Sequence, residues 1–403
     1  MDPEQLVSRA REVLERNTKR VGEYEIVVPS PKSYPVPYAW DTAFHVLGLL
    51  YVDQEKARKN LRAILSLQRP DGMIPNAPLK TGDQDLRSQP PILLYAFRRY
   101  LEETSDKASA GLWFPRFKLF YRWWSERGDP FGKGLVSPFT GLRRSTRVLG
   151  ALGRLFRSEG LGTPEFYALC STGMDNHPIG DFFRAVKVGG LYYLPVFEIL
   201  LNSSLVSGAE SLAEVARRLG MRGEEKELRE EAERRRKLMN ELMWSEEDGF
   251  YYPASWKGEK VKVKSATAFT TLWAGVPDNR QARKLLSHLL SPEEFWGEYG
   301  VPTVAFDDPK FMSGQPPWLV SRDTYYWRGP VWAPITLLIA EGLIRYGRKR
   351  LAGELVEKWV KLVEKSGFAE YFYPDGRPGR AHLGEDFGWT AAVTIYLLKA
   401  PEH

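Results

Sequence analysis

Apolar residues recur at helical spacing along almost the whole of this 403-residue chain, and this periodicity constrains its fold more than any other feature. Clear stripes run over residues 57–65, 282–290 and 351–363. Strand signals are few and short, and lie mainly at 249–252 and 261–263. The sequence therefore predicts an all-α fold. The expected helices are 3–19, 40–52, 55–67, 90–104, 113–127, 190–206, 209–219, 224–243, 265–275, 280–290, 331–346, 350–366 and 388–399.

Brief turns and long loops rich in aromatic residues alternate between these helices. The loop at 68–76 resembles the loop at 296–302 in this respect. A helix–loop–helix unit of about 50 residues, recurring roughly six or seven times, is typical of helical hairpins that close into a toroid. We predict an (α/α)6 barrel that occupies residues 1–403 as a single domain, with 128–163 as a lid or side insertion. An open α-solenoid is the alternative.

Composition narrows the partners that this chain would bind. The net charge is +6, but Lys and Arg are interleaved with Glu, so we expect no nucleic acid partner. The lysines over 257–264 are expected to form a solvated face. The longest apolar run, 46–52, is too short to cross a membrane, and no signal pattern opens the chain.

A single cysteine, Cys170, allows no intrachain disulfide and favours a reducing compartment. We therefore expect a cytoplasmic protein without a membrane partner, and a homo-oligomer is left open. Abundant Glu, Lys and Arg alongside little Cys are typical of thermophilic proteins.

Two carboxylates lie in aromatic or turn-forming settings that suit sugar chemistry. Asp175 lies in 171–178, a segment with Gly, Asn and Pro, and Glu370 lies in 369–376, between aromatic residues. The stretch 325–332 adds indole and phenol rings, which offer flat faces to a sugar ring. Glycosidic bond cleavage requires two acids of this kind. Loops far apart in sequence converge at one end of a closed barrel, so both acids are expected to share a cleft.

Inversion at a glycosidic bond needs one protonated carboxyl and one ionised carboxylate. Asp175 suits the acid, because Gly173 permits a tight turn and Asn176 can bind a sugar hydroxyl. Helix capping is the alternative role for Asp175. Glu370 suits the base, but residue patterns alone leave Glu298 as a rival.

Trp40 and Asp41 open a predicted helix, where a carboxylate beside an indole can hold sugar hydroxyls. A purely structural role at the positive end of the helix dipole is nearly as good an account of Asp41. Other chemistries fit poorly, because the chain has no Cys or His cluster, no phosphate-cradling loop and no nucleophile elbow. We expect no metal and no other cofactor.

Five motifs, in order along the chain, resemble those of glycoside hydrolase family 63 and, more loosely, its trehalase and glucoamylase-like relatives. They are 40–44, 173–178, 326–332, 370–371 and 387–390. The segment 244–252 looks like a structural signature of the same group. The resemblance implies an (α/α)6 barrel, anomeric inversion, Asp175 as general acid and Glu370, rather than Glu298, as base. The expected substrate-binding residues are Tyr34, Trp40, Asp41, Phe44, Gln89, Asn176, Tyr326, Trp327, Arg328, Gly329, Trp332, Tyr371 and Trp389.

The length of the chain narrows the resemblance, because there is no room for the β-sandwich of the larger members. The chain is similar to compact bacterial and archaeal members that hydrolyse mannosylglycerate or glucosylglycerate, which are compatible solutes. This predicts an inverting α-glycosidase that acts on a small α-linked hexoside and binds no partner beyond that carbohydrate. An α-glucosidase or trehalase-like enzyme is one alternative, and a non-catalytic sugar-binding toroid is another.

Two positions depart from the family pattern and bear on substrate choice. His177 stands where Ser is common, and Asp386 stands where Gln is expected before Phe-Gly-Trp. A glycerate carboxylate would need a cationic partner. The sequence does not choose among the loop arginines Arg87, Arg143, Arg144, Arg322 and Arg377.

Overall fold

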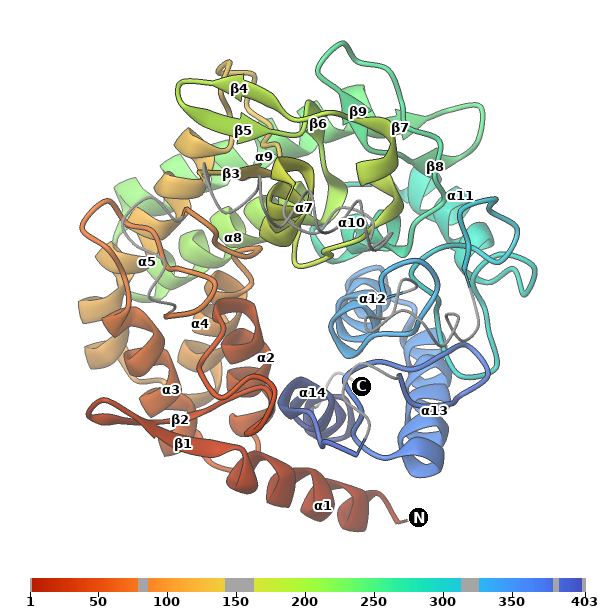
Figure 1. Ribbon diagram of the computed structural model, residues 1–403. Coiled ribbons are helices and arrows are strands. Elements are labelled where there is room, and N and C mark those ends of the chain that lie inside the picture. Colours follow the sequence, from red (N-terminus) through yellow and green to blue (C-terminus); the bar gives the residue numbers. More distant parts are fainter. Residues whose placement is uncertain (1, 79–85, 142–162, 313–325, 380–383, 401–403) are drawn as a thin grey trace.

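A computed structural model describes residues 2–78, 86–141, 163–312, 326–379 and 384–400 of the chain. Within these residues six helices follow one another around a closed inner ring, in the order α2, α4, α8, α10, α12, α14 and back to α2 (Figure 1). Their bounds are Ala39–Leu49, Leu93–Thr104, Ile199–Arg218, Thr270–Trp273, Ala333–Arg345 and Gly388–Lys399. A 3-10 turn, η3 (Ala266–Phe269), precedes the short α10. The predicted (α/α)6 barrel is confirmed.

Each inner helix is preceded along the chain by an outer helix. The outer helices are α1 (Pro3–Arg16), α3 (Gln54–Ser66), α5 (Lys107–Arg127), α9 (Arg222–Met243), α11 (Asn279–Leu289) and α13 (Lys349–Ser366). Sequence patterns separate the two layers. Every residue of α2 is buried, whereas in α11 burial is limited to one stripe of Gln281, Ala282, Leu285, Leu286 and Leu289. A helix that is apolar all round belongs in the interior, and an amphipathic one covers it.

Connection lengths decide where loops gather. The return turns from inner to outer helices, such as 50–53 and 105–106, are short, whereas the connections that enter the inner helices are long. Because the inner helices all follow an outer one, their N-terminal ends lie at the same end of the barrel as these long connections. Loops from all parts of the chain therefore meet at that end.

Small antiparallel sheets lie within the long connections. The hairpin β1 (Thr18–Val21) and β2 (Tyr24–Val27) precedes α2. Strands β3 (Phe139–Thr140), β5 (Leu191–Tyr193) and β4 (Val186–Val188) form one sheet, which lies in the α5–α8 connection together with α7 (Pro164–Leu169). β6 (Val196–Phe197), which directly precedes α8, pairs with β9 (Ala254–Ser255) in the α9–α10 connection, where β7 (Trp244–Ser245) also pairs with β8 (Phe250–Tyr251).

Several predicted elements need correction. The segments 190–206 and 209–219 were expected to be two helices, but β5 is followed by the single helix α8, whose start is fixed by Glu198. The Glu198 carboxylate accepts hydrogen bonds from the Leu200 and Leu201 amides, which caps the helix. Strand β8 confirms the prediction at 249–252. No strand forms at 261–263, where Val261 and Val263 are buried as part of a loop.

Helix α5 begins before the predicted residue 113, because Asp106 caps it by accepting from the Ser109 amide. Most of the segment 128–163, expected to be a lid or insertion, lies outside the described residues, and the described part contributes β3. In the described part of the chain, no helix is both long enough and apolar enough to span a membrane.

The ring closes where the first inner helix, α2, packs against the last, α14. Gly48 makes this approach possible, because a Cβ atom at that position would lie 2.4 Å from the carbonyl oxygen of Ala392. The clash would be with the backbone of a buried helix, which no side-chain rotation can relieve. Gly48 is therefore required by the closed ring.

Replacing Gly48 with Ala tests this packing. We expect Gly48→Ala to lower the free energy of unfolding by about 1–3 kcal/mol, because overpacking between two fixed helices outweighs the better helix propensity of Ala. The matched control is Gly353→Ala in α13, where no atom lies within 4 Å of the new Cβ. That variant should be unchanged or more stable by up to about 1 kcal/mol. Denaturant unfolding of both variants checks the prediction, and equal stabilisation would contradict the closed ring.

Candidate active site

A layered group of aromatic rings lies at the loop end of the barrel, beside the N-terminal ends of α2, α12 and α14. Trp327 and Trp332 stack face to face, with ring centroids 3.7 Å apart and planes 8° apart. Tyr371 also stacks on Trp332, with ring centroids 4.9 Å apart. Trp40 lies 6.0 Å from Trp327 and 5.7 Å from Trp389. The predicted aromatic residues from three connections are thus brought together.

Backbone pairing explains this assembly. Val331 and Phe372 exchange hydrogen bonds of 2.7 and 3.0 Å, so the loop before α12 runs beside the loop before α14. The indole Nε1 of Trp332 donates to the Tyr326 carbonyl at 3.0 Å, which folds the motif back on itself. The indole Nε1 of Trp389 donates to the Glu370 carbonyl at 2.9 Å. These bonds hold the backbone that carries Glu370.

Glu370 is a deeply buried carboxyl, with 5% of its surface exposed. Burial raises its pKa well above the ordinary value, and the charges of Asp41, Asp175 and Glu385 raise it further. The Tyr326 hydroxyl donates a hydrogen bond to Oε1 and acts in the opposite direction, because it stabilises the ionised form. Glu370 is therefore a carboxyl with a raised proton affinity and a fixed donor.

Asp175 belongs to a tight turn against the aromatic group. Gly173 has a φ of +75°, and a Cβ atom there would lie 2.6 Å from the Trp40 ring, so glycine is required for both reasons. The Asn176 side-chain oxygen accepts from the Trp327 amide at 2.8 Å. Asp175 itself is half-buried, and its charge raises the pKa of Glu370. The two predicted acids therefore lie in the same part of the molecule.

A third carboxyl, Asp41, lies in the first turn of α2. It is 3% exposed, and burial raises its pKa to about 8. Its charge raises the pKa of Glu370 and also that of Tyr38. Gln89, from the α3–α4 connection, accepts from the Trp40 amide at 3.2 Å and so braces the start of this helix.

Other expected substrate-binding residues have contacts with protein groups. Phe44 is fully buried, one helical turn beyond Trp40, and its ring packs against that indole at 5.9 Å. Gly329 allows close packing, because a Cβ atom there would lie 2.4 Å from the Met312 carbonyl oxygen. The Arg328 guanidinium forms two hydrogen bonds with Asp181, at 2.6 and 2.9 Å.

The rival base, Glu298, lies apart from this group. Its exposed carboxylate pairs with Lys361 at 2.6 Å, and that hydrogen bond lowers its pKa. His177, the departure from the family pattern, is fully buried and shares a 2.8 Å hydrogen bond with the Ser265 hydroxyl. Burial lowers the pKa of His177 to about 3, so it is neutral. The Asp386 carboxylate, the other departure, pairs with Arg16 at 2.6 Å.

Among the described arginines considered for a substrate carboxylate, Arg87 shares an electrostatic neighbour with Asp41 and Asp175. Its charge lowers the pKa of Tyr38, a residue whose pKa the charges of Asp41 and Asp175 raise. Its guanidinium also lies 5.4 Å from the Tyr167 ring centroid. Arg377 instead pairs with Asp375 at 2.7 Å. The remaining candidates, Arg143, Arg144 and Arg322, lie outside the described residues.

Sequence reasoning missed three residues near the acids. Tyr38 is half-buried, and burial raises its pKa to about 12. Glu385 accepts hydrogen bonds from the Ser30 and Ser33 hydroxyls and thereby joins the loops before α2 and α14. Asp181 binds Arg328. The proline-flanked aromatic pair at 34–38 was a signal for Tyr38, whereas nothing in the residue pattern marked the two carboxylates.

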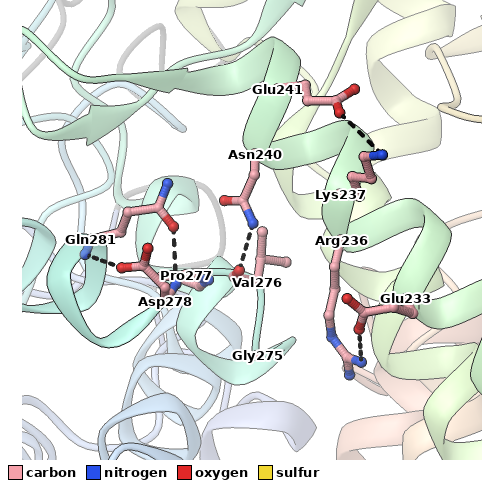
Figure 2. Close-up of a pocket in the computed structure, with 10 residues that line it drawn as sticks. All are labelled: Glu233, Arg236, Lys237, Asn240, Glu241, Gly275, Val276, Pro277, Asp278 and Gln281. Carbon is pink, nitrogen blue, oxygen red and sulfur yellow. Dashed lines mark hydrogen bonds and ion pairs between the residues drawn. The ribbon is translucent and has the colours of Figure 1, made fainter.

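A pocket of about 540 Å³ lies away from these residues, where α9 approaches the short turn between α10 and α11 (Figure 2). Its polar groups bond to one another. Asn240 donates to the Val276 carbonyl at 2.9 Å, and Asp278 caps α11 by accepting from the Gln281 amide at 2.7 Å. None of the predicted site residues lines it.

Comparisons with known proteins relate the chain as a whole to a family of glycoside hydrolases. Residues 34–390 match the model of the mannosylglycerate hydrolase MGH1-like glycoside hydrolase domain. A mannosylglycerate hydrolase from Thermus thermophilus is 29% identical over 96% of this chain and 99% of its own length.

Solved structures extend the likeness. A GH63 mannosylglycerate hydrolase from Thermus thermophilus, solved in complex with Tris, superimposes with a TM-score of 0.76 at 25% identity, covering 97% of this chain and 99% of that one. Neutral trehalase Nth1 from Saccharomyces cerevisiae superimposes with a TM-score of 0.71 at 22% identity, covering 93% of this chain and 73% of that one. The likeness to the trehalase concerns the fold alone.

Proposed function

This chain belongs to the MGH1-like glycoside hydrolases of family 63, and we propose that it is an inverting α-glycosidase that hydrolyses mannosylglycerate or glucosylglycerate to hexose and glycerate. One observation carries the proposal. Asp175 and Glu370, which are far apart in sequence, are coupled electrostatically beside a wall of stacked indoles. Two acids and an aromatic wall are the elements that hydrolysis of a glycoside requires.

In the proposed reaction Asp175 holds a proton and gives it to the glycosidic oxygen as the bond from that oxygen to the anomeric carbon breaks. Glu370 removes a proton from a water molecule, whose oxygen forms a bond to the anomeric carbon from the opposite face. The electron pair of the broken bond stays with the protonated leaving oxygen. The products are a hexose of inverted configuration and glycerate.

The raised pKa of Glu370 suits the role of base, provided that Asp175 carries its proton. A protonated Asp175 is neutral and no longer raises the pKa of Glu370, so ionisation of Glu370 becomes easier. The Tyr326 hydroxyl stabilises the carboxylate that results. Asp41, with a pKa of about 8, is protonated at neutral pH and can both donate to and accept from sugar hydroxyls.

Arg87 supports a substrate that carries a carboxylate. It lies near Tyr38, which also experiences the charges of Asp41 and Asp175, and a guanidinium can bind a glycerate carboxylate through two hydrogen bonds. The relatives named mannosylglycerate hydrolases support the same class. We propose that the enzyme recycles such a glycoside as a compatible solute.

The substrate is tested by hexose release from mannosylglycerate, glucosylglycerate, trehalose and kojibiose. We expect release from a glycerate glycoside, and Arg87→Gln should raise its KM roughly 10- to 100-fold because a charge-assisted hydrogen bond is lost. A neutral aryl hexoside should be unaffected by that change. Arg377→Gln is the matched control, since Arg377 already pairs with Asp375. Hexose release from the neutral disaccharides alone would contradict the proposed glycerate substrate and would leave the fold assignment unchanged.

The two acids are tested by Asp175→Asn and Glu370→Gln. Each should lower kcat on the natural substrate by about 10²–10⁴-fold, the usual contribution of a general acid or base. Glu298→Gln is the control and should retain full activity, because Glu298 lies in an exposed ion pair. NMR of the first product anomer checks inversion. Normal turnover by Asp175→Asn would refute the acid assignment, and a product of retained configuration would refute the mechanism.

The dependence of activity on pH tests the environment of Glu370. The base has to be ionised, so kcat should fall as the pH drops through its raised pKa. Tyr326→Phe removes the hydrogen bond that favours the ionised form, so this acidic limb should move to higher pH. Full profiles for the wild type and the variant give the measurement. A limb that stays in place or moves to lower pH would exclude Tyr326 as the group that stabilises the base.

A further inference from the structure

Arg328, in the aromatic segment 326–332, forms an ion pair with Asp181. Asp181 is a different carboxylate from the three acids described above. Arg328 donates to both carboxylate oxygens of Asp181, at 2.6 and 2.9 Å, and its side chain is 12% exposed against 30% for Asp181. Lys310 adds one contact to the same carboxylate at 2.9 Å. A planar guanidinium that forms two bonds fixes orientation as well as distance, which a single ammonium contact does not.

Asp181 lies on the segment that carries Asp175. This segment runs from Gly173 through the 3-10 turn η2 (Pro178–Phe182), and the segment 326–332 lies opposite. The two are joined by a second bond, from the Trp327 amide to the Asn176 side-chain oxygen at 2.8 Å. Adjacent residues of the aromatic segment therefore bind two points of the acid-bearing segment, one next to Asp175 and one six residues beyond it.

Hydrogen bonds to residues outside it also hold the aromatic segment, 326–332, in place. The Gly329 amide donates to the Thr303 hydroxyl at 3.0 Å, and the Met312 amide donates to the Arg328 carbonyl at 2.8 Å. The carbonyl of Thr303 in turn accepts from the Ser265 hydroxyl, which bonds to His177 at 2.8 Å. Arg328 is therefore held on a fixed backbone, and Asp181 is the residue of the acid-bearing segment that binds its guanidinium.

We propose that Asp181 is a positioning residue, and that its two-bond ion pair with Arg328 sets the placement of Asp175 over the glycosidic oxygen. This inference rests on the proposed role of Asp175 as the general acid. Proton transfer needs the donor within hydrogen-bonding distance of the leaving oxygen, and a displacement of about 1 Å can cost about 10²-fold in rate. The ion pair acts on the bond-breaking step through Asp175 and does not touch the substrate.

The leaving group separates this role from general support of the fold. A natural glycoside needs a proton on its departing oxygen, whereas a glycosyl fluoride of the same hexose departs with little help from an acid. We expect Asp181→Asn to lower kcat on the glycerate glycoside by roughly 10- to 100-fold. Hydrolysis of the glycosyl fluoride, followed by fluoride release, should fall by less than about threefold. Arg328→Lys should repeat this pattern, because it keeps the charge but loses the planar fork.

Controls keep each outcome decisive. Lys310→Ala removes only the single contact and should leave both rates nearly unchanged. If Asp181→Asn does not fold, as judged by circular dichroism, Arg328→Lys decides the question. An equal loss on both substrates would overturn the positioning role and indicate structural support alone.

Asp175→Asn is run beside these variants to separate the inference from its premise. One outcome is that Asp175→Asn keeps the rate of glycosyl fluoride hydrolysis while Asp181→Asn loses it. In that case the acid assignment stands and the proposed role of Asp181 is wrong. If Asp175→Asn loses both activities equally, the acid assignment itself fails and the inference fails with it.

Discussion

The contact between α2 and α14 is the constraint on which the rest of the molecule depends. Gly48 lets the backbones of the first and last inner helices touch, and this contact turns a row of hairpins into a ring. The same two helices carry Trp40 and Trp389 at their N-terminal ends, with ring centroids 5.7 Å apart. A change in the helix contact would therefore be felt in the aromatic wall. The helix contact that closes the ring therefore also brings these aromatic residues of the site together.

Closure also creates an electrostatic difficulty, because it gathers three carboxyls in a poorly hydrated place. Burial raises the pKa of Glu370 and of Asp41, and the charges of Asp41 and Asp175 further oppose ionisation of Glu370. Two features counter this effect. The inner helices direct the positive ends of their dipoles towards the site, and Tyr326 donates a hydrogen bond to Glu370. The ionisation of Glu370 therefore depends on the protonation of its neighbours, which is the condition that the proposed acid–base pair needs.

Much of the barrel could be predicted from sequence, because helices with strong apolar patterns have few alternatives. The predicted helix 388–399 has the bounds of α14, and 350–366 differs from α13 by one residue. Predictions failed where tertiary contacts decide. Residues 190–206 contain a strand because Leu191–Tyr193 pairs with β3 and β4, and Val261 and Val263 are buried without joining a sheet. Such pairings depend on partners distant in the chain.

The same division holds within the site. The motifs predicted which loops would meet, since aromatic rings and acids in long connections have one end of the barrel available to them. They did not predict which side chains would face one another. Arg328 was predicted to bind the hexose, and the folded structure adds a partner for its guanidinium that the motif did not show, the Asp181 carboxylate. A carboxylate provides a stronger partner than a neutral hydroxyl, and its position is visible only after folding.

The aromatic residues of the site differ in how deeply they are buried, and this difference separates their roles. Trp332 stacks with both Trp327 and Tyr371, and all three rings are almost fully buried, so little of their surface is open to solvent. Their polar atoms hold backbone, as when Trp332 binds the Tyr326 carbonyl. Tyr34, Tyr38 and Tyr326 are half-buried, so part of the surface of each remains accessible. In the proposed mechanism the tyrosines therefore contact the sugar, while the stacked rings keep Glu370 from moving as charge develops, which lowers the reorganisation that catalysis would otherwise require.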